Sequence, residues 1–207
     1  MTPTRIALFA IVLLLAAGAG ALLARQQLHP SAPGPLTTGT ELVPPRELPQ
    51  FSLISHEGRP FERAALQGHW TLMFFGFTHC PGICPMTLTT LADVRKRLHD
   101  LPPGDLPQIV LVSLDPERDT PERLAQYVVR FDPTTVGVTG SADALDQFAA
   151  SLGITHRKVP TGGSDYMIDH SAVVLLLDRG GREAAVFSPP HDPEQLSADY
   201  RRMLARG

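Results

Sequence analysis

Residues 71–85 read TLMFFGFTHCPGICP, and this segment carries the strongest structural signal in the chain. Its first seven residues form a largely apolar run, as expected for a short strand that is buried on both faces of a sheet. The run leads directly into Cys80 and Cys84, on a turn with two prolines, where a helix is expected to begin. A strand followed by a helix across a short turn is a basic unit of α/β proteins.

Apolar runs and helical patterns alternate along the rest of the chain. Strands are expected at residues 71–77, 108–114 and 172–177, with weaker candidates at 136–139 and 184–188. Helices are expected at residues 83–98, 141–152 and 193–204, and one more is expected to start at Thr120. Thr120 is a good capping residue, and Pro121 and Glu122 suit a first helical turn. The alternation predicts an α/β domain with a largely parallel central sheet flanked by helices.

The composition excludes several function classes. The chain has 207 residues, of which 43% are apolar and 19% charged, which is typical of one globular domain with additional segments. A net charge of −3 without a basic run argues against a nucleic-acid partner, because binding to phosphates requires positive charge. The two cysteines can form one disulfide or supply part of a metal site, but they cannot cross-link a small secreted scaffold.

The first 25 residues differ from the rest. Residues 6–23 contain no charge and no proline, and they are flanked by Arg5 and Arg25. The run is close to the length of a transmembrane helix, and Arg5 favours a cytoplasmic N-terminus. A cleaved signal peptide is the alternative, because small residues at 17–21 could form its cleavage site. Both alternatives place the rest of the chain outside the cytoplasm.

A proline-rich segment follows. Residues 26–50 contain six prolines and almost no apolar periodicity, which predicts an extended spacer. Residues 51–207 are long enough to form one well-buried domain. The predicted organisation is therefore an anchor or signal sequence at residues 1–25, a linker at 26–50 and a folded domain at 51–207.

The cysteine pair is the strongest candidate for chemistry. Side chains at a strand-to-helix turn lie at the carboxyl end of a sheet, where α/β proteins bind their ligands. The helix N-terminus favours a thiolate over a thiol, and residues four apart can share one face of a helical turn. Cys80 and Cys84 can therefore close a disulfide, bind a soft metal or serve as buried structural cysteines.

The segment DYMIDHS, residues 165–171, places His170 just before the strand at 172–177. That strand could neighbour the one at 71–77, but spacing alone leaves open whether His170 is a ligand or an ordinary histidine. Among the remaining residues, His79 is interpreted as part of the Cys80 environment. Met86 is expected in the core, with a thioether ligand as the alternative. Asp115 and Asp119 are expected to order the loop after the second strand, with capping of the next helix as the alternative for Asp119.

Three motifs in this order resemble those of the Sco (SenC/PrrC) family. They are GFTHCPGICP at residues 76–85, VSLDPERDTP at 112–121 and DYMIDHS at 165–171. The resemblance extends from about residue 46 to the C-terminus. It implies a membrane-tethered, thioredoxin-like protein that delivers copper to cytochrome c oxidase, with an α/β fold in which helices flank a central mixed sheet. It also implies that Cys80, Cys84 and His170 bind the copper.

The residue types are consistent with copper. Cu(I) prefers soft thiolates and accepts imidazole, whereas structural zinc takes four ligands, and no fourth soft ligand is obvious here. We therefore expect Cu(I), with Cu(II) as a second oxidation state. A metal-binding histidine needs a partner for its other ring nitrogen. Asp169 is predicted to supply that partner or to act in docking, with simple solvent exposure as the alternative.

Two functions remain open from the sequence. A copper chaperone would take copper from an upstream donor and dock to the copper-binding subunit of the oxidase, where it would load the binuclear CuA centre. A thiol–disulfide oxidoreductase would use Cys80 and Cys84 to reduce the cysteines of that same copper site, and would depend on an external thiol reductant. Copper delivery is favoured because three residues separate the cysteines, whereas thioredoxin-type reductases have two.

A peroxidase on the same fold is disfavoured, because Met73 and Phe77 stand where a PxxxTxxC signature would have proline and threonine. For either open function, the apolar N-terminal run and the family resemblance predict a single-pass protein of a bacterial cytoplasmic membrane. Its domain would face the periplasm or the cell exterior.

Overall fold

The centre of the fold is a set of three parallel strands. We describe it in a computed structural model that covers residues 16, 18, 34–163 and 165–206, and the account below concerns the compact unit Pro35–Ala205. Strand β4 (Thr71–Gly76) is buried at all six positions. It pairs in parallel with β5 (Gln108–Ser113), which pairs in parallel with β6 (Val136–Thr139). The apolar runs thus form the buried strands that they predict.

Antiparallel strands extend the sheet on both sides. Strand β9 (Val174–Leu177) lies against β4, followed by β10 (Glu183–Phe187) and β1 (Gly39–Arg46). On the other side, β2 (Leu53–Ser55) pairs with β6 and β3 (Pro60–Phe61) pairs with β2. Within the described residues the sheet has eight strands in the order β1-β10-β9-β4-β5-β6-β2-β3.

The sheet is therefore mixed, which confirms the mixed sheet implied by the family resemblance, whereas the largely parallel sheet expected from the alternation alone is wrong. A short turn joins β9 and β10, with Gly181 N donating to Asp178 O at 2.9 Å. A turn of this length can only reverse the chain, because parallel neighbours need a crossover of a dozen residues or more. The neighbourhood of β9 and β4 that the sequence suggests is confirmed.

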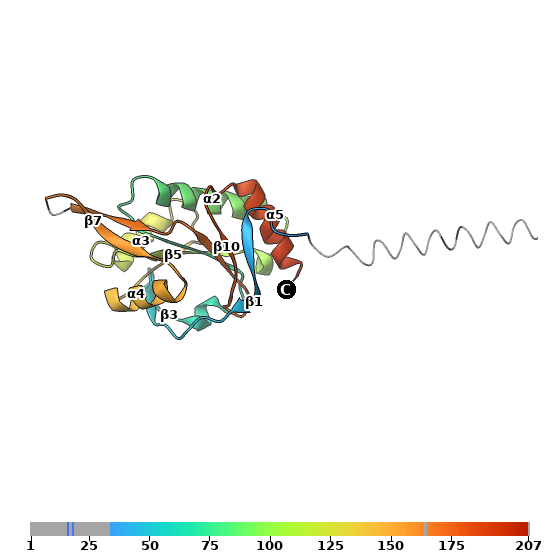
Figure 1. Ribbon diagram of the computed structural model, residues 1–207, viewed down its shortest axis with the longest axis horizontal. Helices are drawn as coiled ribbons and strands as arrows, with labels where there is room; N and C mark the ends of the chain where they lie inside the picture. The colour runs from blue at the N-terminus through green and yellow to red at the C-terminus, as the bar shows by residue number, and fades with distance from the viewer. Residues whose placement is uncertain (1–15, 17, 19–33, 164, 207) are drawn as a thin grey trace, which may run out of the picture. The chain divides into compact units, whose positions relative to one another are not determined.

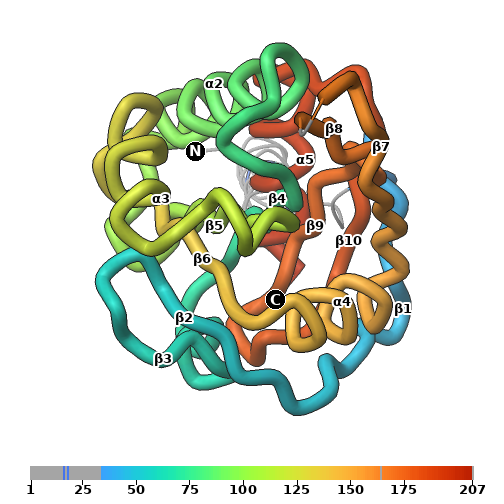
Figure 2. The backbone as a smooth tube through the Cα atoms, turned by 90° about the vertical axis from the view of Figure 1, so that its left-hand side faces the viewer, coloured from blue at the N-terminus to red at the C-terminus, as the bar shows by residue number. Residues whose placement is uncertain are grey.

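Helices flank the sheet as predicted. They are α2 (Ile83–Arg97), α3 (Pro121–Val128), α4 (Ala142–Ser151) and α5 (Pro193–Leu204), with short 3-10 helices η1 (Arg63–Leu66) and η2 (Pro103–Asp105) in connecting segments. The Thr120 hydroxyl accepts a hydrogen bond from Arg123 N at 3.3 Å, which confirms the predicted cap of α3. Helices α2 and α5 lie on one side of the sheet and α4 on the other (Figures 1 and 2).

The structure differs from the predicted spacer over part of residues 26–50. Strand β1 forms an edge of the main sheet, and Leu48 is buried. Prolines fit this position because an edge strand leaves some of its backbone groups unpaired. The backbone N–H groups of Thr37 and Thr38 each donate to the buried Asp199 carboxylate of α5 at 2.8 Å. The folded unit thus begins well before residue 51.

The predicted anchor or signal sequence, residues 1–25, lies outside the described residues apart from Ala16 and Gly18. Among the residues that the structure does describe, no helix has the length and apolarity needed to cross a bilayer. Both N-terminal alternatives therefore stay predictions.

A separate hairpin carries His170. Strand β7 (His156–Gly162) pairs with β8 (Asp165–His170), and in the described part of the chain neither strand is hydrogen-bonded to the main sheet. The hairpin extends from one end of the domain, at the label β7 in Figure 1. Its β7 strand is mostly exposed and lacks an alternating apolar pattern, so the sequence predicts no strand there. In β8, the two-residue period places Tyr166, Ile168 and His170 on one face.

Candidate metal centre

The two cysteines lie where β4 passes into α2. Cys80 is in the turn, Gly82 is the N-cap residue of α2, and Cys84 is in the first helical turn. The backbone N–H of Cys84 donates to Cys80 Sγ at a distance of 3.4 Å. The helix N-terminus therefore supports negative charge on the Cys80 sulfur, as the sequence predicts.

Strand β8 brings His170 to the cysteines. Its Nε2 lies 3.7 Å from Cys84 Sγ. The rings of Phe74 and Phe77 meet the imidazole in edge contacts, with centroid distances of 5.9 and 6.2 Å. The Nδ1 atom lies 3.0 Å from the Ser171 carbonyl oxygen. This arrangement leaves Nε2 facing the sulfur, so the three side chains singled out in the sequence meet in one place.

The two sulfur atoms differ in accessibility. Cys84 is completely buried, whereas Cys80 is 8% exposed, and both are free thiols. Gly76, the last residue of β4, leaves room for the deeper sulfur, because a Cβ at that position would lie 2.9 Å from Cys84 Sγ. The pair is therefore a dithiol in which Cys84 is completely buried and Cys80 is slightly exposed.

Hydrogen bonding also makes the two thiols unequal acids. The hydrogen bond from the Cys84 side chain is the main cause that lowers the pKa of Cys80 to about 5, with further help from the backbone N–H groups of Cys84 and Gly82. The same interaction, together with burial, raises the pKa of Cys84. Cys80 is therefore a thiolate at neutral pH, while Cys84 keeps its proton until a ligand displaces it.

One fast-reacting thiol per reduced chain is expected at neutral pH. The rate of Cys80 alkylation by iodoacetamide should rise as pH increases through about 5, because it follows the thiolate fraction, and should level off near neutrality. Cys84 should react slowly, because it is protonated and buried. Mass spectrometry of the wild type and of Cys80→Ser measures both rates. A midpoint at the ordinary thiol value of 9.0 would contradict the assignment.

Asp169 does not hold the His170 ring. Its carboxylate lies 3.2 Å from Arg157 Nη2 across the hairpin, and both side chains are exposed. The prediction of a ring partner is therefore wrong: successive side chains of a strand point to opposite faces, and the Ser171 carbonyl takes that role. The docking role of Asp169 stays a prediction.

Two other candidates lie at the rim of the site. Met86 is 65% exposed, so its expected place in the core is wrong. It belongs to the first turn of α2, where Ile83 is also exposed, whereas Leu88 and Leu91 further along are buried. His79 Nδ1 lies 3.2 Å from the Thr78 hydroxyl, and the His79 side chain is partly exposed.

The loop after β5 supports the cysteine turn. The buried Asp119 carboxylate accepts hydrogen bonds from Thr78 N at 2.9 Å, from the Thr78 hydroxyl at 2.6 Å and from the Ser113 hydroxyl at 2.6 Å. The predicted ordering role of Asp119 is thus confirmed. His79, Asp115 and Asp119 bring ligand atoms within 4.8 Å of one another, but protein donors already occupy both carboxylates, so we interpret this cluster as structural.

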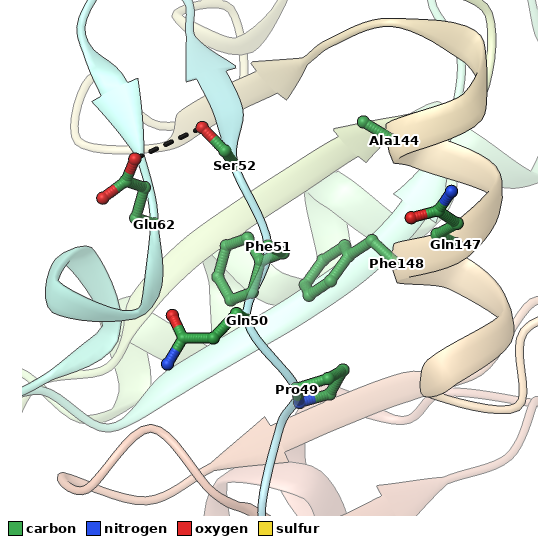
Figure 3. A pocket seen from close by; sticks show the side chains of 8 residues that line it. All are labelled: Pro49, Gln50, Phe51, Ser52, Glu62, Ala144, Gln147 and Phe148. Carbon is green, nitrogen blue, oxygen red and sulfur yellow. Dashed lines mark hydrogen bonds between the residues drawn. The ribbon is translucent and has the colours of Figure 1, made fainter.

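An open pocket of about 590 Å³ lies elsewhere, between α4 and the segment that leads into β2 (Figure 3). The rings of Phe51 and Phe148 meet in it with centroids 4.3 Å apart, and Ser52 donates to Glu62 at 3.2 Å on its rim. Its lining contains neither a cysteine nor a histidine. The pocket therefore does not compete with the thiol site as the chemical centre.

Comparisons with known proteins all identify the same family. Residues 40–205 match the family model SCO1/SenC. The mitochondrial SCO2 homolog of Bos taurus is 38% identical over 156 residues, which cover 75% of this chain and 59% of that protein. The chain thus matches about three fifths of the length of the mammalian SCO2 homologs.

Solved structures agree with this match. Copper-bound ScoI of Arabidopsis thaliana is 34% identical with a TM-score of 0.71, and the match covers 75% of this chain and 97% of that one. BsSco, a member of the Sco family of cytochrome c oxidase assembly proteins, shares the fold at 23% identity and a TM-score of 0.61, with coverages of 78% and 94%. The predicted thioredoxin-like fold is confirmed by these neighbours.

Proposed function

Because the chain belongs to the SCO1/SenC family, we propose that it binds copper through Cys80, Cys84 and His170 and delivers it during assembly of a respiratory cytochrome c oxidase. The observation that carries the proposal is the approach of His170 Nε2 to within 3.7 Å of Cys84 Sγ, beside the Cys80 sulfur. The copper-bound structure of Arabidopsis thaliana ScoI supports copper as the cargo. BsSco, a member of a family of cytochrome c oxidase assembly proteins, supports a role in oxidase assembly.

The donor set suits a copper cargo. Two thiolates and one imidazole match the soft ligands that Cu(I) prefers, and three ligands leave the ion open to exchange. Copper would meet an existing thiolate at Cys80 and displace the proton of Cys84 on binding. The Ser171 carbonyl beside Nδ1 fixes the orientation in which the imidazole completes the site through Nε2.

Delivery then proceeds by ligand exchange. An external thiol reductant keeps Cys80 and Cys84 reduced in an oxidising compartment, and an upstream donor supplies the copper. Cysteines of the CuA-bearing oxidase subunit replace the ligands one at a time. We place the domain on the outer side of a bacterial cytoplasmic membrane, tethered by the apolar run at residues 6–23.

Thiol–disulfide exchange is the second candidate function. The thiolate of Cys80, the less buried of the two cysteines, favours it, because a thiolate can attack an oxidised copper site to form a mixed disulfide. Cys84 would then attack Cys80, release the reduced substrate and leave a Cys80–Cys84 disulfide. The complete burial of Cys84 hinders that second step, and the three residues between the cysteines differ from the two of thioredoxin-type reductases. For these reasons we favour copper delivery.

A competitive Cu(I) titration of the reduced chain tests the proposal. The wild type should bind one equivalent tightly. His170→Ala should weaken binding by about tenfold or more, because even groups that only orient a metal ligand contribute that much. His99→Ala removes an exposed histidine in the turn that follows the C-terminal end of α2 and should leave the affinity unchanged. Weak or non-stoichiometric binding by the wild type would overturn copper delivery in favour of dithiol redox chemistry.

A further inference from the structure

A single loop contacts both halves of the copper site. In the segment after β5, Asp119 holds the cysteine turn through Thr78. Asp115 and Arg118, in the same loop, hold the hairpin that carries His170. Their common point of contact on the hairpin is Tyr166, a residue that the sequence analysis does not single out.

Tyr166 makes its closest contacts with buried or partly buried groups. Its hydroxyl donates to Asp115 Oδ1 at 2.6 Å and also lies 3.1 Å from Glu117 Oε2. The guanidinium carbon of Arg118 stands 3.8 Å from the centre of the Tyr166 ring, within the range of a cation–π contact. Arg118 Nε in turn donates to Asp115 Oδ2 at 2.5 Å, so the three side chains form one closed unit.

Weaker ion pairs surround this unit. Arg118 Nη1 lies 3.0 Å from Asp165, and Lys158 Nζ lies 2.6 Å from Glu117. Their acidic partners are well exposed, and ion pairs of this kind contribute little to stability. Among these polar contacts, the hydrogen bond of Tyr166 with the completely buried Asp115 is therefore the main one. Ile168, on the same face of β8, adds apolar packing because it is buried in the core.

This attachment matters because the main sheet does not hold the hairpin. Among the described residues, β7 and β8 pair only with each other. Tyr166 and His170 lie four residues apart on the same face of β8, a span of about 13 Å along a strand. His170 pairs with His156 at the base of the hairpin, whereas Tyr166 pairs with Pro160 near its turn. A tilt of β8 after release of Tyr166 would therefore change the angle at which His170 meets the sulfur atoms.

We propose that Tyr166, held by Asp115 and Arg118, is a positioning residue that keeps His170 at the two thiols before copper arrives. The inference rests on the proposed copper site and adds the means by which its third ligand is fixed in advance. Without the attachment, only a fraction of the molecules present His170 correctly, and the apparent affinity falls in proportion to that fraction.

Tyr166→Phe is the test, because it removes the hydroxyl and keeps the ring beside Arg118. Cu(I) affinity should fall by about three- to tenfold, the change that corresponds to the loss of one hydrogen bond. The matched control is Tyr200→Phe, which removes a hydroxyl that donates to Asp105 O at 2.6 Å. Its effect on thermal unfolding should be similar, but its Cu(I) affinity should equal that of the wild type.

A double-mutant cycle separates positioning from general stability. In a His170→Ala background, Tyr166→Phe should cause no further loss of affinity, since the tyrosine acts through the histidine. Equal losses in both backgrounds would overturn the proposal.

The metal-free protein gives an independent readout. Nuclear Overhauser contacts between His170 and the rings of Phe74 and Phe77 should weaken in Tyr166→Phe but persist in Tyr200→Phe. If the wild type binds no copper, the proposed function fails. If it binds copper through His170 and Tyr166→Phe changes neither the affinity nor these contacts, only the positioning role fails.

Discussion

Replacing either cysteine with serine is expected to abolish tight Cu(I) binding. A hydroxyl is a hard, weakly acidic group that Cu(I) does not favour, and a single thiolate with one imidazole leaves the ion poorly held. The loss should exceed the roughly 10–100-fold effect of removing a group that only orients a ligand. Competitive titration of Cys80→Ser and Cys84→Ser, each reduced beforehand, measures it.

The thermal stability of the two serine variants provides the control. Cys84→Ser places a hydroxyl in a fully buried site, whereas Cys80 lies nearer the surface, so only the former should unfold at a lower temperature. Both variants should nevertheless lose copper to a similar extent. Tight Cu(I) binding that survives removal of both sulfur atoms would overturn the ligand assignment.

Asp119→Ala is expected to be strongly destabilising. It leaves the Thr78 N–H and the hydroxyls of Thr78 and Ser113 without their common acceptor. Because buried donors without a partner are costly, the free energy of unfolding should fall by about 3 kcal/mol or more. Chemical denaturation of the metal-free, reduced protein measures this change.

Asp93→Ala serves as the matched substitution. Asp93 pairs with Lys96 at 3.2 Å on the exposed side of α2, and exposed pairs of this kind contribute about 0–1 kcal/mol. Asp119→Asn keeps one acceptor oxygen, so its free energy of unfolding should lie between those of Asp119→Ala and Asp93→Ala. If Asp119→Ala unfolds as readily as Asp93→Ala, the carboxylate does not organise the cysteine turn.

The central part of the fold follows from the sequence because its signals are strong and local. The runs that form β4, β5 and β9 are continuous and apolar, and Thr120 marks the start of α3. The direction of β9 was harder to predict, because burial on both faces looks the same in parallel and antiparallel strands. Edge strand β1 was missed because its pairing uses the backbone, and its sequence contains two prolines.

The site residues likewise divide into those that local sequence motifs identify and those that they do not. Cys80, Cys84 and His170 are identified from their motifs, and the structure brings them together. Asp169 and Met86 were misplaced, since neighbours in sequence need not share a face with the site. The alternation in β8 contains the missing information, because it assigns Tyr166 to the face of His170 and turns Asp169 away. The contact between Tyr166 and Asp115 spans 51 positions of the chain, and no local pattern predicts it.

The unequal depth of the two sulfur atoms gives an order to the release of any ion that they share. A recipient approaching from solvent reaches Cys80 and the edge of His170 first, because Cys84 is enclosed against Gly76. The bond to Cys84 is then the last to break, after the recipient has already supplied donors of its own. On the proposed function, copper held in this way would pass from one protein to another through a shared intermediate and would not be set free in the surrounding water.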